Sequence, residues 1–401
     1  MTGLADALML GAGWNAALVT IGAALLGGAA GAVGSFLFLR GRALISDAIA
    51  HATLPGVGLA FLIMAGLGGD GRNLAGLMAG AAATALLGVL AVEAIGRRTR
   101  LTEDAAIGAA LSVFFGAGLV ILTVIQSLPA GRQAGLEGFL LGATAGMLLH
   151  EALIVAIGGA MAVAAVWALR RPMILAAFDP GFATATGWPV RRVDLAMLAV
   201  VLAITVIGLK IVGLVLIVAL LIIPPAAARF WTERAVGMAA IAGALGAAAG
   251  WVGTAISATA PALPTGPIIV LTCAALFAVS LLVAPQRGAL AALVRHRLMR
   301  RRVLQRQGLL AMARGVPAAD PAARAVLRGE GLIDAAGQAT AAGRAAAARL
   351  MRDEARRALL RRLRPDHPAL QSDDGLTPID ALLATDEIAD LDRRLMRGAG
   401  S

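Results

Sequence analysis

The chain has 401 residues, of which 59% are hydrophobic and 15% charged, and its mean hydropathy is +0.83. A soluble domain is nearer half apolar and a quarter charged, so this composition excludes a soluble protein for most of the chain and places it in a membrane. The net charge of +11 comes mostly from arginines beside apolar runs or in the C-terminal tail, which indicates membrane topology rather than nucleic-acid binding. No nucleic-acid partner is expected.

Apolar runs of about twenty residues, long enough to cross roughly 30 Å of hydrocarbon, recur before Arg287. They predict an all-α polytopic membrane protein with about nine spans, or eight, because residues 137–149 could dip into the membrane without crossing it. The basic flank of a cleavable signal peptide is absent from residues 1–14, so these are expected to form a short extracytoplasmic N-terminus. Spans are predicted near residues 15–39, 43–66, 74–96, 105–125, 147–169, 193–208, 211–228, 235–258 and 267–284.

The arginines predict which loops face the cytoplasm. Arg72, Arg132 and Lys210 are the only basic residues in one set of alternate loops. The positive-inside rule places the other, arginine-rich set in the cytoplasm, with the N-terminus outside and the C-terminus inside a bacterial inner membrane. That set comprises Arg40, Arg42, Arg97, Arg98, Arg100, Arg170, Arg171, Arg191, Arg192, Arg229, Arg234 and Arg287.

Asp47 and His51 stand four residues apart in the second apolar run, which on a helix puts both side chains on one face. A carboxylate oxygen and an imidazole nitrogen at this spacing can bind one divalent cation, and such donors suit Mn, Fe or Zn. The only cysteine, Cys273, offers no thiolate cluster. An ionisable residue inside the bilayer costs about 2.5–3.5 kcal/mol on insertion scales, so it usually lines a polar path.

Two structural explanations for the same pair stay open at this point. Asp47 could cap its helix, and His51 could hydrogen-bond a neighbouring span. Pro55 and Gly56 follow one turn later and are expected to break the helix, a device that exposes ion sites at membrane depth.

Three spaced stretches form a recognisable set. They are Gly34–Arg40 with the Ala43–Val57 segment, Thr102–Gly108, and Val212–Arg229 with its Pro224-Pro225 pair. In this order, over about residues 15–286, they resemble the permeases of zinc, manganese and iron ABC importers. The resemblance implies a permease domain over residues 15–286 and a homodimer of the cobalamin-importer type. Its other partners would be ATPase subunits and an extracytoplasmic metal-binding protein.

The resemblance also implies roles for particular residues. Asp47 and His51 would form the metal site inside the membrane, the metal being cargo and no cofactor being bound permanently. The pattern Asp179-x-x-x-Ala183-x-x-x-Gly187 predicts a short cytoplasmic helix closed by Gly187, similar to the coupling helix that such permeases seat on their ATPase. Asp179 also complements the helix dipole, which by itself explains its presence.

Glu103 and Asp104 lie in a short inner loop and are candidates for an ATPase contact, although charge clusters there are usually solvated. No G-x-x-x-x-G-K-[ST] stretch occurs, so ATP is expected to be hydrolysed by a separate subunit and the chain is not expected to be an enzyme. Two rival functions are an ABC permease for cobalamin or a siderophore, and a secondary metal transporter that uses no ATP.

Residues 287–401 are predicted to form a small, mainly helical cytosolic extension. The basic run Arg295–Arg302 is placed to meet anionic lipid. The stretch from Ala325 faintly resembles a winged-helix segment of metal-dependent repressors. Three acidic groups could sense a metal, although solvated turns explain them as well: Asp366-His367, Asp373-Asp374 and Asp386-Glu387.

Overall fold

The computed structural model describes residues 3–398 except 70, 72, 129–146, 261–262, 317 and 372. The predictions made for Arg72, for Arg132 and for most of segment 137–149 therefore lie outside the described residues, as does the side chain of Lys210. The chain divides into two compact units, Met1–Leu290 and Ala291–Ser401.

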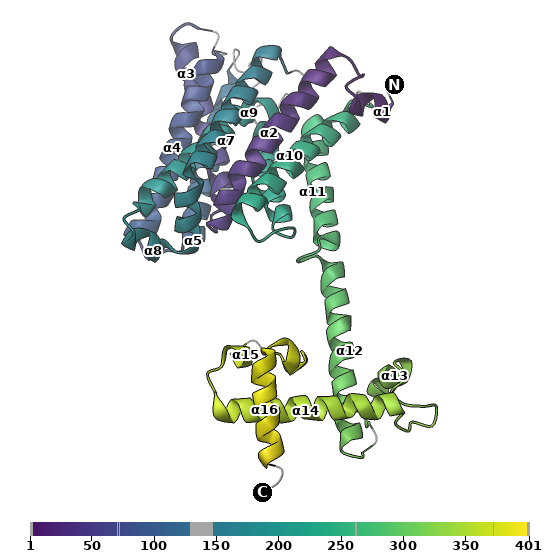
Figure 1. Cartoon of the computed structure of the whole chain (residues 1–401). Coiled ribbons are helices and arrows are strands. Elements are labelled where there is room, and N and C mark those ends of the chain that lie inside the picture. Colours follow the sequence, from purple (N-terminus) through teal and green to yellow (C-terminus); the bar gives the residue numbers. More distant parts are fainter. Residues whose placement is uncertain are drawn as a thin grey trace. The chain divides into compact units, whose positions relative to one another are not determined.

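The first unit consists of helices throughout its described part (Figure 1). By length and composition, eight described helices can cross a membrane, and Val212–Ala228 is a shorter apolar helix. The predicted all-α polytopic fold is therefore confirmed. The helices are α1 (Leu4–Leu8), α2 (Trp14–Leu39), α3 (Ile45–Gly66), α4 (Leu74–Arg98), α5 (Glu103–Ser127), α7 (Leu149–Phe178), α8 (Pro180–Ala185), α9 (Val190–Ala228), α10 (Ala235–Ser257) and α11 (Thr265–Val283).

Helix α9 is two helices that fold back on each other. The backbone is non-helical at Gly213, where φ is +79°, a conformation that glycine adopts without strain. A Cβ atom built on Gly208 would lie 2.6 Å from Cδ1 of Ile217, whereas nine residues of straight helix would separate the two backbones by about 13.5 Å. The two halves therefore form a hairpin, in agreement with the separate spans predicted at 193–208 and 211–228.

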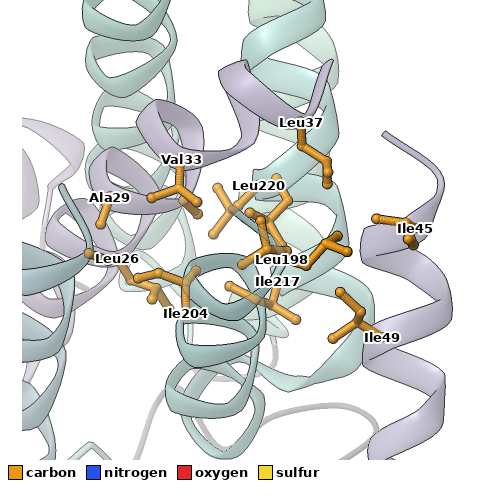
Figure 2. Close-up of a cluster of buried hydrophobic side chains, with 14 of the residues drawn as sticks. Leu26, Ala29, Val33, Leu37, Ile45, Ile49, Leu198, Ile204, Ile217 and Leu220 are labelled. Atoms are coloured by element: carbon orange, nitrogen blue, oxygen red, sulfur yellow. The ribbon is translucent and has the colours of Figure 1, made fainter. Parts of the chain in front are cut away.

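The largest apolar cluster of the unit joins α2, α3 and both halves of α9 (Figure 2). Leu26 and Val33 of α2 point toward Ile204 and Leu220 of α9 in this cluster. Both halves of the hairpin contribute side chains to one core. This core holds α9 between α2 and α3.

Helices α2 and α10 cross at backbone contact, which only small residues allow. A Cβ on Gly27 would lie 2.2 Å from the carbonyl oxygen of Gly246, and a Cβ on Gly246 would lie 2.1 Å from that of Gly27. One turn away, a Cβ on Gly250 would meet the carbonyl oxygen of Ala23 at 2.4 Å. The glycine content of these spans is thus a packing requirement at this crossing.

Gly246→Leu is expected to force α2 and α10 apart and to destabilise the unit by about 3 kcal/mol, since backbone atoms cannot yield to a side chain. Thermal unfolding of the purified protein in detergent measures the effect. Gly96→Leu is the matched control, because a Cβ on Gly96 meets nothing within 4 Å. Equal melting temperatures for the two variants would contradict the packing argument.

The predicted helix break at Pro55-Gly56 is wrong, because α3 continues from Ile45 to Gly66 through both residues. The reason lies in the neighbouring helices. A Cβ on Gly56 would lie 2.0 Å from the carbonyl oxygen of Gly80 in α4, and a Cβ on Gly118 of α5 would lie 3.1 Å from Cδ of Pro55. Pro55 and Gly56 therefore let three helices approach closely.

Ion pairs gather the arginine-rich loops at one end of the unit. Arg40 donates to both carboxylate oxygens of Asp194 at 3.1 and 3.2 Å. Arg42 lies 2.8 Å from Glu93 at the end of α4 and also pairs with Glu103 at the start of α5. Figure 1 shows the loops before α3, α5, α9 and α10 at this same end, which we call the basic end.

Arg287, which follows α11, donates to Oε1 of Glu233 in the loop before α10, at 2.7 and 3.2 Å. These hydrogen bonds and the positive charge lower the pKa of the Glu233 carboxyl. The loop before α10 is therefore tied to the chain that leaves the last span.

The second unit holds the described helices α12 (Ala289–Ala313, which begins at the boundary), α13 (Pro321–Gly329), α14 (Ala341–Leu363), α15 (Pro368–Gln371), η3 (Ile379–Ala381) and α16 (Thr385–Gly398). One isolated antiparallel bridge joins Ile333 to Ala339. Two apolar clusters form its core, one centred on Leu327 and the other on Ile379.

The acidic residues of the tail serve its own structure. The side chain of Asp373 is 1% exposed and lies 3.2 Å from Nε of Arg357, and Nε2 of His367 lies 3.3 Å from Glu387. Asp374 accepts backbone N–H groups of Thr377 and Leu376, which lower its pKa. Across the described parts of both units, no group of three or more His, Cys, Asp or Glu side chains could hold a metal ion.

Candidate metal site and coupling helix

The structure brings Asp47 and His51 together at the start of α3. Nε2 of His51 lies 3.4 Å from Oδ1 of Asp47, as expected for residues four apart on a helix. The two side chains are 19% and 35% exposed for His51 and Asp47 respectively, so the pair is partly sheltered but open on one side.

Neighbouring groups hold the imidazole of His51 in place. Its ring meets Phe115 of α5 edge to face, with ring centroids 4.8 Å apart and an interplanar angle of 80°. Nδ1 is buried and has no hydrogen-bond partner among the described residues. The apolar contact fixes the ring and leaves Nε2 directed at Asp47.

Among the described residues, Asp47 does not cap its helix and Nδ1 of His51 makes no hydrogen bond to a neighbouring span, so neither structural explanation describes this arrangement. The N-cap of α3 is Leu44, and no side chain caps the helix there. Asp47 is the third residue of α3, where its charge complements the helix dipole. With a rise of 1.5 Å per residue, the two Cα atoms lie about 3 and 9 Å along α3 from its first residue, toward the basic end.

The pair is exposed only at the start of α3. Leu44, at the N-cap, is 54% exposed and lies on the same side of the helix as Asp47 and His51. The next two turns, Ala52 to Gly58, are buried, and Phe115 of α5 covers the ring of His51. One chain thus leaves Asp47 and His51 partly exposed beside an exposed leucine, as two groups that could bind a metal ion.

The second candidate element, α8, has both of its predicted ends. Oδ1 of Asp179 accepts the backbone N–H of Phe182 at 2.8 Å, which caps the start of the helix. At the other end Gly187 has φ +86°, and its N–H donates to Thr184 while the N–H of Trp188 donates to Ala183. This pair of bonds is a Schellman motif, which requires a left-handed residue such as glycine.

The side chain of Ala183 is fully buried and turns inward from α8. Three aromatic residues in or beside α8 point outward instead: Phe178, Phe182 and Trp188 are 61%, 56% and 45% exposed. Asp179, Ala183 and Gly187 thus shape the helix, and the sequence analysis did not single out the aromatic residues that cover its surface. Their clustering beside a loop predicted to be cytoplasmic was the available signal.

Comparison with known proteins shows to which family this fold belongs. Residues 15–284 match the ABC 3 transport family, which is two thirds of the chain. The chain belongs to the ABC 3 transport family. The predicted relation to the permeases of ABC importers is therefore confirmed.

Two relatives are similar over most of the membrane unit. The manganese transport system membrane protein MntC of Bacillus subtilis is 40% identical over 298 residues, which cover 74% of this chain and 67% of MntC. The zinc transport system membrane protein TroC of Treponema pallidum is 35% identical over 290 residues, which cover 72% of this chain and 95% of TroC.

A solved structure shares the fold. The structure of PsaBC from Streptococcus pneumoniae in complex with Fab aligns with a TM-score of 0.60 at 30% identity. The alignment covers 71% of this chain and 96% of that one. The match to the ABC 3 transport family ends at residue 284, so the winged-helix resemblance of the tail stays a prediction.

Glu103 and Asp104 open α5 at the basic end of this family member. Glu103 pairs with Arg42 and its side chain is still 44% exposed, while Asp104 is exposed and belongs to no ion pair among the described residues. Glu103 therefore helps to tie the loop before α3 to α5, next to the turn that carries Asp47.

Proposed function

We propose that this chain is the permease subunit of an ABC importer that moves Mn, Zn or Fe into the cytoplasm. The observation that carries the proposal is the partly exposed Asp47–His51 pair at the start of α3, in a chain whose relatives are named for manganese and zinc transport. The metal is the cargo, and no cofactor bound permanently is part of the proposal.

The spacing of the two donor atoms suits a first-row metal ion. With metal–ligand bonds of about 2.1 Å, donors 3.4 Å apart subtend about 108° at the ion, close to a tetrahedral angle. The donors are one oxygen and one nitrogen, which admit several divalent ions of the first row. Selectivity among Mn, Zn and Fe is therefore expected to depend on other partners as well.

Two ligands from one chain are too few for a transported ion, so we place the missing ligands on a second copy of the chain. A two-fold axis beside the exposed start of α3 would bring two Asp47–His51 pairs together and provide four donors. The same contact would cover Leu44, a large apolar side chain that is exposed on this side of the helix.

Cysteine crosslinking tests this arrangement. Leu44→Cys, in a chain with Cys273→Ser, is expected to form disulfide-linked dimers in membranes upon mild oxidation, because the two Leu44 positions would lie near the axis. Leu271→Cys on α11, 65% exposed, is the matched control and should stay monomeric. Crosslinking of Leu44→Cys to a different membrane subunit would replace the homodimer by a heterodimer.

The proposed orientation has the N-terminus outside and the basic end in the cytoplasm, where arginines of short loops belong. Metal would arrive from an extracytoplasmic binding protein, pass between the two copies and meet Asp47 and His51 before release at the basic end. Alternating access would be driven by a separate ATPase subunit. We place its contact at α8, with Glu103 and Asp104 as a neighbouring contact.

Metal accumulation in cells tests the proposal against its rivals. A strain that expresses the chain with its ATPase partner should accumulate one of Mn, Zn or Fe, measured by elemental analysis, and lose this with an ATPase variant that cannot hydrolyse ATP. Uptake that persists without ATP hydrolysis would favour a secondary transporter. Uptake of cobalamin or a siderophore, with no change in free metal, would favour the other ABC permease.

A further inference from the structure

A pocket at the basic end is lined by arginines on one part of its wall and by apolar side chains on another. It has a volume of about 480 Å³, within the range of small-molecule sites, and lies between α4 and α9. Leu90, Ala94 and Leu195 form its apolar part, and Arg97, Arg98 and Arg191 its basic part. None of the proposed transport steps uses this pocket.

The two helices present the same gradient. Along α4 the lining passes from Leu90 to Arg98 in eight residues, about 12 Å, toward the basic end. Along α9, which starts at the basic end, the lining passes in the opposite chain direction from Leu195 to Arg191. Apolar lining thus lies deeper in the unit and positive lining at its edge, which is the order of an acyl chain and its phosphate.

The positive charge of the pocket is uncompensated. Among the ion pairs of the described residues, none includes Arg97, Arg98 or Arg191. The one acidic residue of the lining, Glu93, is paired with Arg42 at 2.8 Å. The wall therefore carries a net positive charge toward a ligand.

The helix dipole disfavours the cation of Arg191. Arg191 is the second residue of α9, so its cation stands at the positive end of a helix with no acidic residue in the first turn. A phosphate group there would meet the guanidinium groups and offset this repulsion, while the backbone N–H groups of Val190, Arg192 and Val193 already donate to nearby carbonyl groups. The topology rule explains why arginines are on this side of the membrane, but it does not explain a cation at this helix end beside a cavity.

We propose that the pocket lined by Leu90, Arg97, Arg98 and Arg191 binds the phosphate of an anionic phospholipid from the cytoplasmic leaflet. The glycerol and the upper acyl chain lie along Leu90, Ala94 and Leu195. A soluble partner such as the ATPase fits less well, because three of the seven lining residues are apolar and lie up to two turns inside the spans. The bound lipid would tie α4 to the start of α9, next to the loop that holds α8.

Native mass spectrometry of the full-length chain in detergent tests the proposal. The chain is titrated with phosphatidylglycerol, with phosphatidylcholine and with soluble glycerol 3-phosphate. We expect tight binding of one phosphatidylglycerol per chain and weaker binding of phosphatidylcholine. Glycerol 3-phosphate at equal concentration should not compete with phosphatidylglycerol. Replacing Arg97, Arg98 and Arg191 together by glutamine should weaken the affinity for phosphatidylglycerol about 100-fold, since each arginine contributes about fivefold to the affinity for an anionic headgroup.

Two further variants separate the pocket from general charge. Arg100→Gln with Arg171→Gln and Arg192→Gln removes the same charge from exposed arginines that do not line the pocket, and should change binding less than threefold. Ala94→Trp keeps all arginines, fills the exposed apolar wall and should abolish binding.

Three results would overturn the proposal: equal loss of lipid in the two triple variants, unchanged binding in Ala94→Trp, or full competition by glycerol 3-phosphate. A fourth is loss of the ATPase complex in the pocket triple variant with lipid binding intact, which would assign the pocket to the ATPase. None of these results bears on metal transport by Asp47 and His51.

Discussion

Replacing Asp47 or His51 by alanine is expected to reduce metal uptake at least 100-fold while the complex with the ATPase still forms. The pair supplies both donor atoms that one chain offers, 3.4 Å apart, and a two-fold complex would lose two of its four ligands. Loss of an outer-shell partner alone costs 10- to 100-fold in metal affinity, and loss of a direct ligand should cost more. Uptake of radioactive Mn or Zn by cells measures the effect.

The fold should tolerate these changes, because both side chains are partly exposed and neither belongs to the apolar core cluster. His150→Ala is the matched control, since His150 is an exposed histidine at the start of α7. The conservative variant Asp47→Glu should retain part of the activity with altered preference among metals. Normal uptake in both alanine variants would remove the site, whereas loss of the ATPase complex would indicate misfolding instead.

Much of the first unit could be predicted from the sequence because membrane physics acts on short stretches. Span length follows from the thickness of the hydrocarbon, so the spans near 193–208 and 211–228 were distinguishable although one continuous apolar run links them. The Schellman end of α8 was also predictable, since Gly187 is a local requirement of the backbone.

Features that depend on distant residues were not predictable in this way. Pro55 usually breaks a helix, but Gly80 and Gly118 lie in other spans and pack so closely that α3 continues. The position of Asp47 along its helix depends on where α3 begins, which Ile45 and its buried neighbours decide. The pairing of Arg42 with Glu93 joins residues 51 positions apart, and no local pattern indicates it.

The aromatic surface of α8 leads to the second large effect. Phe182→Ala combined with Trp188→Ala is expected to weaken binding of the ATPase subunit at least 30-fold and to stop transport, with metal binding unchanged. Exposed aromatic residues on a short helix at the basic end have the composition of interface hot spots, each worth 2 kcal/mol or more. Affinity of the purified full-length chain for the ATPase measures the loss.

The control for this double variant has to separate a docking surface from a row of aromatic side chains at the membrane interface, where Trp is common for other reasons. Trp14→Ala serves, because Trp14 is 76% exposed and starts α2 at the end of the unit opposite the basic end. Asp179→Ala offers a graded comparison, since loss of an N-cap costs about 1 kcal/mol and would loosen α8 without removing its surface. If α8 docks the ATPase, affinity should fall strongly in the aromatic variant, slightly in Asp179→Ala and not at all in Trp14→Ala. Equal affinity in all three would make the aromatic residues interfacial anchors and would place the coupling contact elsewhere at the basic end, with Asp104 as the next residue to test.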